Sequence, residues 1–584
     1  MTVAGETLTA RQRVRTFSAW LVAAPLWRVL VAFVVAQWLV VLLVARTVRH
    51  TAWIFYQGGD QLWYYTSAWL LGHGHFTDTS VGYLWPAVLA PGAAIAGPNV
   101  LSLLPMIILF NVVVLMPVAM LALYGVAARI GGRLFGYWVL ALWILVPLLG
   151  IKYTDAGYHQ RYTELTLPTG FGLTGTADFP MMVSSIVAAY FCVRVVFDDR
   201  PQLLHALAGG VTGGIAVAIK PSAGLFIVGP ALAFAVAKRI REAGVFVAGM
   251  VPALITLSFW KYRGYGHLPI VGAQQHAGHV VASAAPVLAL GLHKYIHLNW
   301  SHFLTQLDGL REHFWSVRLI EWLVIGGAIG LARRSLRALM LIGGWFAAYV
   351  IFKGTFVEAN VSDASLFRLM LPSAPAFVLL LASLPLLVPG VPQRLRPEPP
   401  RQPRLSLRRR QAVIVATVGV TSLLPFAAIA AASPIKGPVP GATFIGVRGE
   451  PPIPNLIDIG LRATVRNGAV SLSWKSQHEI GGPVFYHVYR DRPTTNVYLC
   501  ATGGAPAPRC EILLSDVGAT HATHFVDRPR YRGPWVYRVG PSANWLNSTA
   551  YGDVYLMSSP ITVRVPSAPR SAAHFAGART SSKP

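Results

Sequence analysis

The sequence predicts a polytopic α-helical membrane protein that continues into a C-terminal all-β sandwich. Of its 584 residues, 54% are hydrophobic and only 12% are charged, and the mean hydropathy is +0.51. This is more apolar side chain than a water-soluble core of ordinary composition holds. Long apolar runs fill the chain up to residue 432, whereas short alternating runs follow residue 451. Lipid is therefore expected to solvate the first part.

Apolar runs that approach the length of a membrane crossing recur along the first part. A crossing needs about 20 apolar residues, and a backbone in lipid has to satisfy its own hydrogen bonds, so the runs are expected to be helices. Charges at both ends favour an odd total, and we expect about 11 to 13 transmembrane helices. Expected spans lie near 26–45, 180–197, 203–219, 222–237, 243–260, 319–332, 338–352, 369–388 and 412–432.

Lys and Arg outnumber Asp and Glu by 49 to 23 and cluster in short segments between apolar runs. Such clusters mark the cytoplasmic face of a membrane protein. Nucleic-acid binding and contact with anionic lipid are the other interpretations; we adopt the first and expect no nucleic-acid partner. The N-terminus is then cytoplasmic, and the chain after about residue 433 is extracytoplasmic. The clusters are Arg11, Arg13 and Arg15, Lys238 to Arg241, Arg333 to Arg337 and Arg394 to Arg410.

One segment, residues 83 to 151, does not fit simple alternation of crossings. Arg129 and Arg133 belong on the cytoplasmic face, yet alternation puts them outside. Either the proline-interrupted stretch Tyr83 to Gly97 re-enters the membrane, or an extra crossing lies among the proline-broken runs.

Changes in composition define the expected domains. We expect a cytoplasmic segment at 1–25, a transmembrane domain at 26–432, a linker at 433–449, a β-sandwich at 450–566 and a disordered tail at 567–584.

Period-two alternation predicts half-buried strands at 469–474, 485–490 and 535–539. The order of these motifs resembles a fibronectin type III domain, which implies two packed sheets. Cys500 and Cys510 stand at hairpin-like separation in this extracytoplasmic part, so we expect a disulfide, with two free thiols as the alternative. The resembling motifs are Asn467-Gly-Ala-Val-Ser-Leu-Ser-Trp474, Tyr486-His-Val-Tyr-Arg490, Phe525-Val-Asp527 and Trp535-Val-Tyr-Arg-Val539.

An acid follows two glycines in the first extracytoplasmic loop, at Gly58-Gly-Asp60. Residues 61–76 have the aromatic, amphipathic composition of a helix that lies on the membrane surface. A carboxylate at this boundary could take a proton from an acceptor hydroxyl or could cap the helix. The residues alone leave both roles open.

A second extracytoplasmic loop, residues 152–179, holds Asp155, Arg161 and Asp178 among aromatic residues. Polar groups that converge on a cavity near the membrane tend to be functional, and a solvated loop is the alternative. Lys220 and Arg368 stand at span edges. Each is placed either to hold a lipid-linked phosphate or to extend toward the head groups.

Together these features resemble the polytopic glycosyltransferases of the GT-C class, which use polyprenyl-phosphate sugars and include the protein mannosyltransferase and aminoarabinose transferase families. The resemblance covers residues 20 to 432. It implies that Asp60 is the catalytic base, with Asp155 and Asp178 as secondary candidates, and that Lys220 and Arg368, joined by Arg161, contact the donor phosphate. The resembling motifs are Gly58-Gly-Asp60, Thr176-Ala-Asp178-Phe-Pro180, Ala218-Ile-Lys-Pro-Ser222 and Phe367-Arg-Leu-Met-Leu-Pro372.

The resemblance also implies a polyprenyl-phosphate-linked sugar donor and an extracytoplasmic glycan or protein acceptor in cell-envelope synthesis, at a bacterial plasma membrane. No cysteine spacing indicates zinc, no metal site is expected, and no cofactor is assigned, although a divalent cation is left open. A transporter or lipid-moving protein, or a non-catalytic envelope assembly factor, is the rival interpretation. The loop histidines that bear on a metal are His276, His279, His293, His297 and His302.

Overall fold

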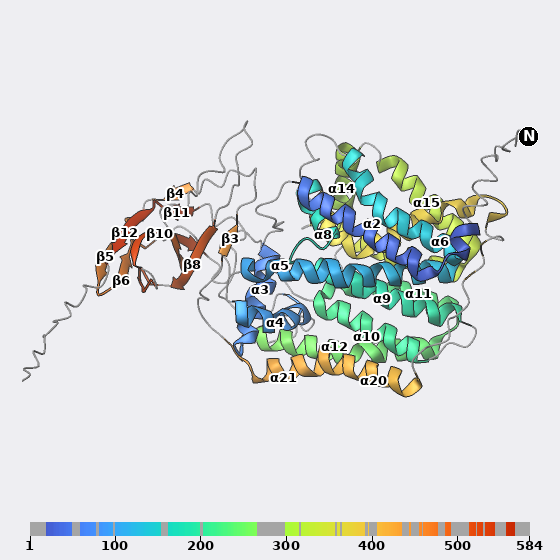
Figure 1. Cartoon of the computed structure of the whole chain (residues 1–584), viewed down its shortest axis with the longest axis horizontal. Helices are drawn as coiled ribbons and strands as arrows, with labels where there is room; N and C mark the ends of the chain where they lie inside the picture. Colours follow the sequence, from blue (N-terminus) through green and yellow to red (C-terminus); the bar gives the residue numbers. More distant parts are fainter. Residues whose placement is uncertain are drawn as a thin grey trace, which may run out of the picture.

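The computed structural model shows an N-terminal bundle of helices followed by a C-terminal group of strands (Figure 1). The predicted division into a helical membrane part and an all-β part is confirmed. The structure describes residues 19–48, 59–76, 81–96, 100–153, 162–198, 203–265, 298–314, 317–356, 359–361, 365–391, 395, 397, 406–434, 443–445, 455–457, 459–476, 485–491, 513–520, 522–529, 532–542 and 556–566.

Within these ranges, seven helical segments, some of which join several helices, are long and apolar enough to cross a membrane. The total of 11 to 13 crossings stays a prediction. The seven are α2 (Leu26–Thr47), the run α5 (Val100–Phe110), η1 (Asn111–Leu115) and α6 (Met116–Tyr153), α9 (Asp178–Phe197), α12 (Ile240–Tyr265), α16 (Leu336–Gly354), the run α17 (Ser365–Met370), η4 (Leu371–Ser373), α18 (Ala374–Ala382) and η5 (Leu384–Leu387), and the run α20 (Leu407–Val418), η6 (Gly419–Leu423) and α21 (Leu424–Ala431).

Shorter helices complete the bundle. Several of them coincide with expected spans. Glycine, proline or arginine ends the apolar runs there, and the same residues end the helices. They are α3 (Gly59–Gly72), α4 (Leu84–Ala96), η2 (Tyr162–Thr166), α8 (Leu167–Gly170), α10 (Leu203–Ile219), η3 (Pro221–Ile227), α11 (Val228–Val236), α14 (Trp300–His313) and α15 (Val317–Arg334).

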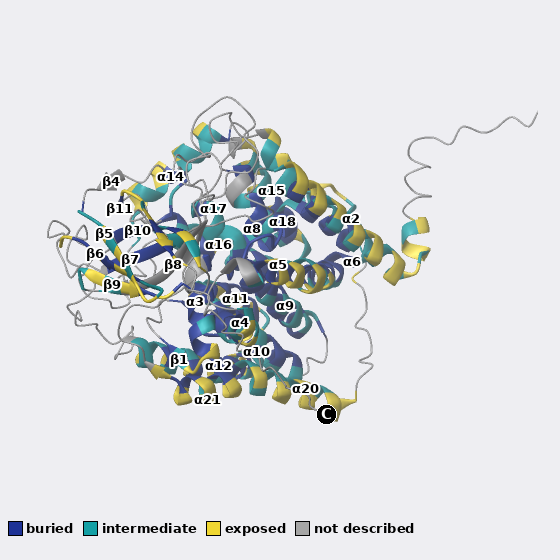
Figure 2. Ribbon diagram, turned by 60° about the vertical axis from the view of Figure 1, so that its left-hand side comes forward, coloured by how far each residue is buried: buried dark blue, intermediate teal, exposed yellow. Residues whose placement is uncertain are grey.

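The outer faces of the bundle expose large apolar side chains. Leu39 of α2 is 61% exposed and Val415 of α20 is 70% exposed, and Figure 2 shows exposed surface along α2, α20 and α21. A water-facing surface of this kind would be unfavourable, so these faces are the ones turned to lipid.

The long run of α5, η1 and α6 reverses direction at Gly132, where φ is 83° and ψ is −178°. This backbone conformation is essentially restricted to glycine. Just before the break, Arg129 pairs with Asp198 at 2.7 Å and the carbonyl of Ile130 accepts a hydrogen bond from Arg334. The reversal therefore joins the Arg129 segment to the basic turn at Arg333 to Arg337, which favours an extra crossing over simple alternation.

The helix predicted at 61–76 forms as α3, and its place on the membrane surface stays a prediction. Tyr64 and Tyr65 are 2% and 1% exposed, and α3 packs against α4 within the bundle. One face of α3, with the rings of Tyr64 and Tyr65, is therefore covered by the bundle. After α3, the short strand β1 (His75–Phe76) pairs in parallel with β2 (Ser433–Pro434).

The described C-terminal strands form two antiparallel sheets, of order β5-β6-β9 and β12-β10-β7-β8-β3, and a two-stranded parallel sheet of β4 and β11. The strands predicted at 469–474, 485–490 and 535–539 are confirmed as β6, β7 and β10. The fibronectin type III assignment stays a prediction. The bounds are β3 (Thr443–Ile445), β4 (Asn455–Ile457), β5 (Arg462–Arg466), β6 (Ala469–Ser473), β7 (Phe485–Asp491), β8 (Leu513–Thr520), β9 (His524–Asp527), β10 (Gly533–Ser542), β11 (Leu556–Ser558) and β12 (Ile561–Val565).

Alternate side chains of the two sheets meet in one apolar core. Val470 and Leu472 come from β6, and Val488, Tyr537 and Val539 come from β7 and β10; each is at most 1% exposed. The period of two in the sequence thus becomes the two faces of each sheet.

A buried charged group links the sheets. Asp527 of β9 accepts hydrogen bonds from Arg490 of β7 at 2.7 Å and from the hydroxyl of Tyr537 of β10 at 2.6 Å. Burial and the bond to Asp527 raise the pKa of the Tyr537 phenol. Because the carboxylate and its partners lie on different sheets, this contact fixes how the sheets face each other.

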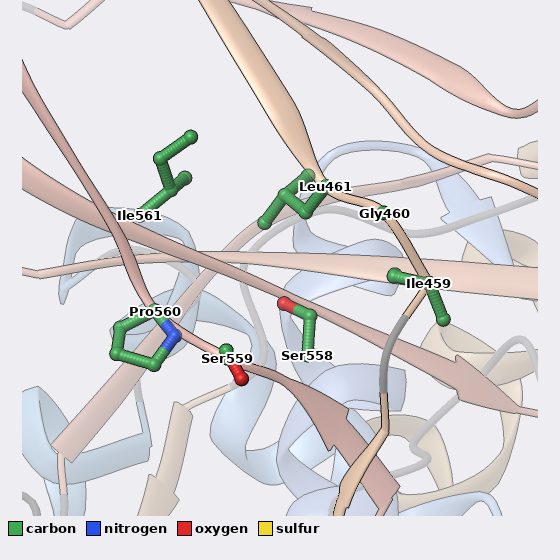
Figure 3. A pocket seen from close by; sticks show the side chains of 7 residues that line it. All are labelled: Ile459, Gly460, Leu461, Ser558, Ser559, Pro560 and Ile561. Carbon is green, nitrogen blue, oxygen red and sulfur yellow. The ribbon is translucent and has the colours of Figure 1, made fainter.

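A hollow of about 230 Å³ opens at the edge of the β part (Figure 3). It is lined by residues 459–461 and 558–561, none of which is charged. The hydroxyl of Ser558 already accepts a hydrogen bond from the backbone of Val539. The hollow thus offers few polar groups to orient a ligand.

Replacing Gly132 by Ala is expected to lower stability by about 1–3 kcal/mol, because a Cβ disfavours its backbone conformation. The melting temperature of the purified protein in detergent measures this. Gly244→Ala is the matched control, since Gly244 lies in α12 with open space around its Cβ position. Equal melting temperatures for the two variants would contradict the proposed role of the reversal.

Asp527→Asn is expected to destabilise the β part by about 3 kcal/mol, because it leaves the Arg490 guanidinium without its charged partner. Hydrogen exchange of the β7 and β10 amides in the full chain should become faster. Arg466→Gln, which changes an exposed charge on β5, should leave that exchange unchanged. Slow exchange retained in Asp527→Asn would show that the charged group does not hold the sheets together.

Candidate active site

Asp178 opens α9, Lys220 follows the last residue of α10, and their side chains form an ion pair. Lys220 Nζ donates to Asp178 Oδ1 at 2.7 Å, and the two side chains are 14% and 1% exposed. A carboxylate at a helix N-terminus and an ammonium at a C-terminus both complement the helix dipole. Two candidates that the sequence offered separately are therefore one unit.

Proline fixes the backbone at Lys220. The residue before a proline is disfavoured in the helical region, and Lys220 is extended, with φ −147° and ψ 117°. Helix α10 therefore ends at Ile219, and η3 begins at Pro221. After Pro221, the hydroxyl of Tyr349 in α16 donates to the carbonyl of Ser222 at 3.1 Å, and this bond attaches η3 to α16.

The loop of residues 171–177, which leads into Asp178, is held by side chains from elsewhere. Gln61 of α3 accepts from the Gly175 amide at 2.6 Å, and the indole of Trp85 in α4 donates to the Gly175 carbonyl at 3.1 Å. Both backbone groups of one loop residue are thus satisfied by other elements.

Asn111 supplies a second anchor for this loop. Its Nδ2 donates to the carbonyls of Gly172 and Thr174, both at 3.1 Å. The hydroxyls of Thr174 and Thr176 lie 2.8 Å apart within the loop. These contacts stabilise an irregular backbone segment that is buried within the bundle.

Asp60 belongs to the first turn of α3, and the structure describes its place in the helix but not its side chain. Gln61, the next residue, contacts the loop that leads to Asp178. Tyr64, one turn further along α3, donates to the carbonyl of the last residue of α10 at 3.4 Å, directly before Lys220. The first turn of α3 therefore lies against both segments that carry the ion pair.

Arg368 lies on α17 and is half-buried. The ring of the preceding Phe367 packs edge-on against Tyr162, with centroids 6.1 Å apart, and contacts Phe314 at 5.1 Å. The following η4 packs on α9, the helix that begins with Asp178. The structure thus places the segment that follows Arg368 against α9, and the role of Arg368 as a phosphate contact stays a prediction.

The remaining candidates were Asp155, Arg161, Cys500 and Cys510. They lie outside the described residues, so their roles and the disulfide stay predictions. Cys192 is buried in α9.

The second oxygen of the Asp178 carboxylate is buried and has no hydrogen-bond partner among the residues that the structure describes. A buried oxygen without a donor carries a desolvation cost. A hydroxyl of a bound molecule would offset that cost beside the Lys220 ammonium. The Lys220 ammonium can therefore attract an anion, and the Asp178 carboxylate can accept a hydrogen bond from a hydroxyl a few ångströms away.

Sequence reasoning missed Gln61, Trp85, Asn111 and Tyr349, which hold the site in place. One signal was available: Asn111 is an amide within an apolar run, and polar side chains inside a membrane segment usually have a specific partner. The other three stand among aromatic or loop residues and carry no such mark.

In the described part of the chain, no group of three or more His, Cys, Asp or Glu side chains could hold a metal ion. His302, one of the five histidines predicted from the sequence to lie in a loop, lies in α14, and its Nε2 is 3.1 Å from the carbonyl of Ala359. The other four lie outside the described residues.

Comparison with solved structures finds two crystal structures of ArnT from Cupriavidus metallidurans, one bound to undecaprenyl phosphate and one in the apo state. The TM-scores are 0.36 and 0.37, at 15% and 16% sequence identity. Each match covers 68% of this chain, and 64% and 63% of the ArnT chains, which is less than two thirds of their length. No family model matches the sequence, and no curated protein does. Similarity at this level assigns neither substrate nor activity.

Asp178→Asn and Lys220→Met should each destabilise the protein by about 3 kcal/mol, because either one leaves a mostly buried polar group without its ionic partner. The double variant should lose less than the sum of the two losses. Unfolding in detergent of all four proteins measures the coupling. Losses that simply add would show that the pair contributes no interaction energy.

Proposed function

We propose that the chain is a membrane glycosyltransferase that moves a sugar from a polyprenyl-phosphate donor to an extracytoplasmic glycan or protein acceptor. Asp178 and Lys220 form an ion pair, and the segments that lead to both residues contact the start of α3, which contains Asp60. This is the observation that carries the proposal. A cation, a buried carboxylate and a second acid are the groups that a displacement at a sugar phosphate requires.

The Lys220 ammonium would contact the donor phosphate. Because it is a point charge, it can keep its bond to Asp178 and still attract phosphate oxygens. Asp178 would act as a positioning residue, since its carboxylate is buried and directs the ammonium. Arg368 and Arg161 remain proposed as further phosphate contacts, and Asp155 as a further acid.

Asp60 would act as general base. In this step, the acceptor hydroxyl transfers its proton to the Asp60 carboxylate while its oxygen forms a bond to the anomeric carbon. The bond from that carbon to the phosphate oxygen breaks, and polyprenyl phosphate leaves with the electron pair. A single displacement of this kind inverts the configuration at the anomeric carbon of the sugar.

Charge placement supports an extracytoplasmic site. Lys220 follows the last residue of α10, and His205, near the start of the same helix, lies 3.1 Å from Arg410, which belongs to the last basic run. If basic segments mark the cytoplasm, Lys220 faces the other side. The β part, proposed as a fibronectin type III-like domain, would then lie outside and present an acceptor or an envelope partner.

The test is sugar transfer from a panel of polyprenyl-phosphate donors by wild type and Asp60→Asn. We expect the variant to lose turnover by about 100-fold or more while it retains donor binding, because a general base typically contributes 10²–10⁴-fold. Lys220→Gln should instead weaken donor binding.

Asp308→Asn is the matched control, because Asp308 is an exposed acid on α14, with 74% of its side chain accessible. Its turnover should equal that of wild type. Full transfer by Asp60→Asn would refute the base role, and absence of transfer from every donor by wild type would refute the proposed function.

A further inference from the structure

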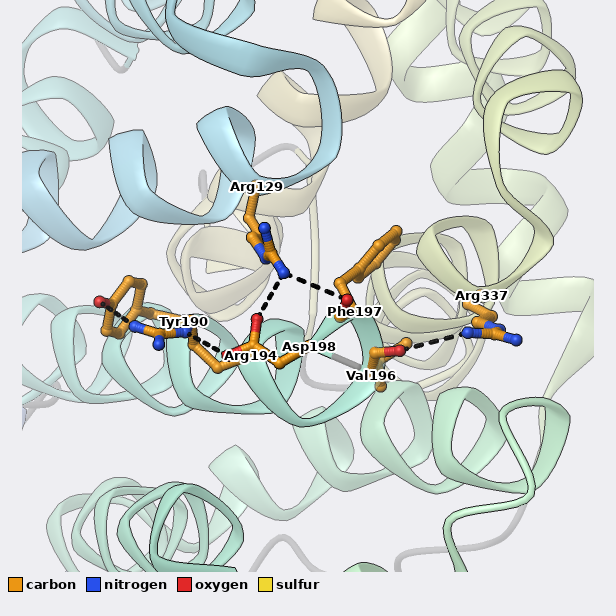
Figure 4. A network of polar contacts seen from close by, with 7 residues as sticks. All are labelled: Arg129, Tyr190, Arg194, Val196, Phe197, Asp198 and Arg337. Atoms are coloured by element: carbon orange, nitrogen blue, oxygen red, sulfur yellow. Dashed lines mark hydrogen bonds and ion pairs between the residues drawn. The ribbon is translucent and has the colours of Figure 1, made fainter. Parts of the chain in front are cut away.

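Basic side chains have different surroundings in the bundle and in the β part. In the bundle, Asp198 at the end of α9 lies between two arginines, 2.7 Å from Arg129 and 2.9 Å from Arg194 (Figure 4). In the β part, the outer face of the sheet β5-β6-β9 exposes basic side chains, and none of its described residues is an acid. Positive charge therefore gathers on this sheet face instead of being paired within it.

The alternation of the strands builds this face. Along β5, Arg462, Thr464 and Arg466 are exposed, whereas Ala463 and Val465 pack on the core of the β part. The same period of two exposes every second residue of β6 and β9, and it continues past the ends of both strands. We name the exposed residues the basic face: Arg462, Thr464, Arg466, Ser471, Ser473, Lys475, His524, Val526 and Arg528.

The strand register aligns the basic face in rows across the sheet. Neighbouring strands are about 4.8 Å apart, so the side chains of one row can contact the same part of a ligand. A basic residue and a hydroxyl stand next to each other in the first row, and two hydroxyls do so in the second. The rows are Arg462, Ser473 and His524, and then Thr464, Ser471 and Val526.

The polar groups of this face are available to a ligand. Among the described residues, the side chains of Arg462, Arg466 and Arg528 form no hydrogen bond or ion pair, and the hydroxyls of Ser471 and Ser473 form none either. A guanidinium binds a carboxylate through two parallel hydrogen bonds. A hydroxyl both donates and accepts hydrogen bonds. The face thus suits a ligand that carries negative groups and hydroxyls together.

The spacing of the charges favours a polymer over a small anion. Arg462 and Arg466 are four residues apart on one strand, which is about 13 Å at roughly 3.3 Å per residue. A single carboxylate or phosphate cannot contact both guanidinium groups. A chain that repeats its negative groups can contact both at once, and an anionic polysaccharide is a polymer of this kind that also carries hydroxyls.

Nucleic acid is the other polyanion to weigh. Proteins that bind single strands stack the bases on aromatic side chains. The basic face has no Phe, Tyr or Trp, and Val526 is its only aliphatic residue. The absence of a stacking surface on this face favours the polysaccharide.

We propose that the basic face binds an anionic polysaccharide. The arginines pair with its carboxylates, and the hydroxyls of Thr464, Ser471 and Ser473 bond to its sugar hydroxyls. No residue of the basic face belongs to the Asp178–Lys220 site, so the proposal does not depend on sugar transfer.

Fluorescence anisotropy of labelled oligogalacturonate, titrated with the full chain in neutral detergent, tests the proposal. Oligogalacturonate should bind, and a neutral galactan fragment of the same length should not. The double variant Arg462→Gln/Arg466→Gln should weaken binding about 10-fold, roughly 3-fold for each exposed ion pair that is lost. Ser471→Ala, which keeps every charge, should weaken it about 3-fold, the effect of one lost hydrogen bond.

Arg241→Gln/Arg564→Gln is the matched control, because it removes the same charge from exposed positions on α12 and β12, outside the basic face. It should bind oligogalacturonate as wild type does. Equal weakening in the two double variants would overturn the proposal. Binding of polyglutamate or oligothymidylate of the same charge as tightly as oligogalacturonate would also overturn it, since the partner would then be an acidic protein or a nucleic acid.

Discussion

Charges in a bundle that faces lipid have to be neutralised within the protein or at its ends, and α9 and α10 meet this constraint at both ends. Asp178 pairs with Lys220 at one end, and Asp198 pairs with two arginines at the other. Most side chains of α9 between them are apolar and buried. Sliding α10 along α9 by one turn, about 5.4 Å, would separate Lys220 from Asp178 and leave both charges uncompensated. The ion pair thereby fixes the level at which the two helices pack.

The loop before Asp178 depends on the same constraint. Its backbone is irregular and buried, so its amides and carbonyls need partners that water does not supply. Gln61, Trp85 and Asn111 provide them from three different elements. Because Gln61 belongs to the turn of α3 that follows Asp60, the contacts that satisfy the loop also set the distance between α3 and the ion pair. The side chains that satisfy the hydrogen bonds of the loop backbone are therefore also the ones that position the groups of the proposed reaction.

The chain that leaves the last helix is attached close to α3. The Ser433 amide donates to the Gly74 carbonyl at 2.9 Å, and Arg263 donates to the carbonyl of Ala432 at 2.6 Å. The guanidinium of Arg263 also lies over the ring of Phe76, 5.0 Å from its centroid, an arrangement that attracts a cation. The start of the segment that leads to the β part is thus joined to the end of the helix that begins at the candidate active site.

The sequence by itself determined most of the helical segments outside residues 83–151 and 261–318. Apolar length, the proline after Lys220 and the basic turns fixed most helical boundaries, and period-two alternation fixed β6, β7 and β10, because these signals are local properties of the backbone and of solvent transfer. It also marked Asp60, Asp178 and Lys220 as candidates, without showing that two of them pair.

Only the tertiary structure decided which helix faces meet. Asp178 and Lys220 are 42 residues apart, and Gln61 and Gly175 are 114 apart. In lipid, helix contacts depend on close packing of small residues rather than on apolarity. Gly210 and Gly249 show this, since a Cβ on either would meet the backbone of the other helix in the α10 and α12 contact. Local pattern carries no information on such pairings, because every face of these helices is apolar enough to be buried or to face lipid.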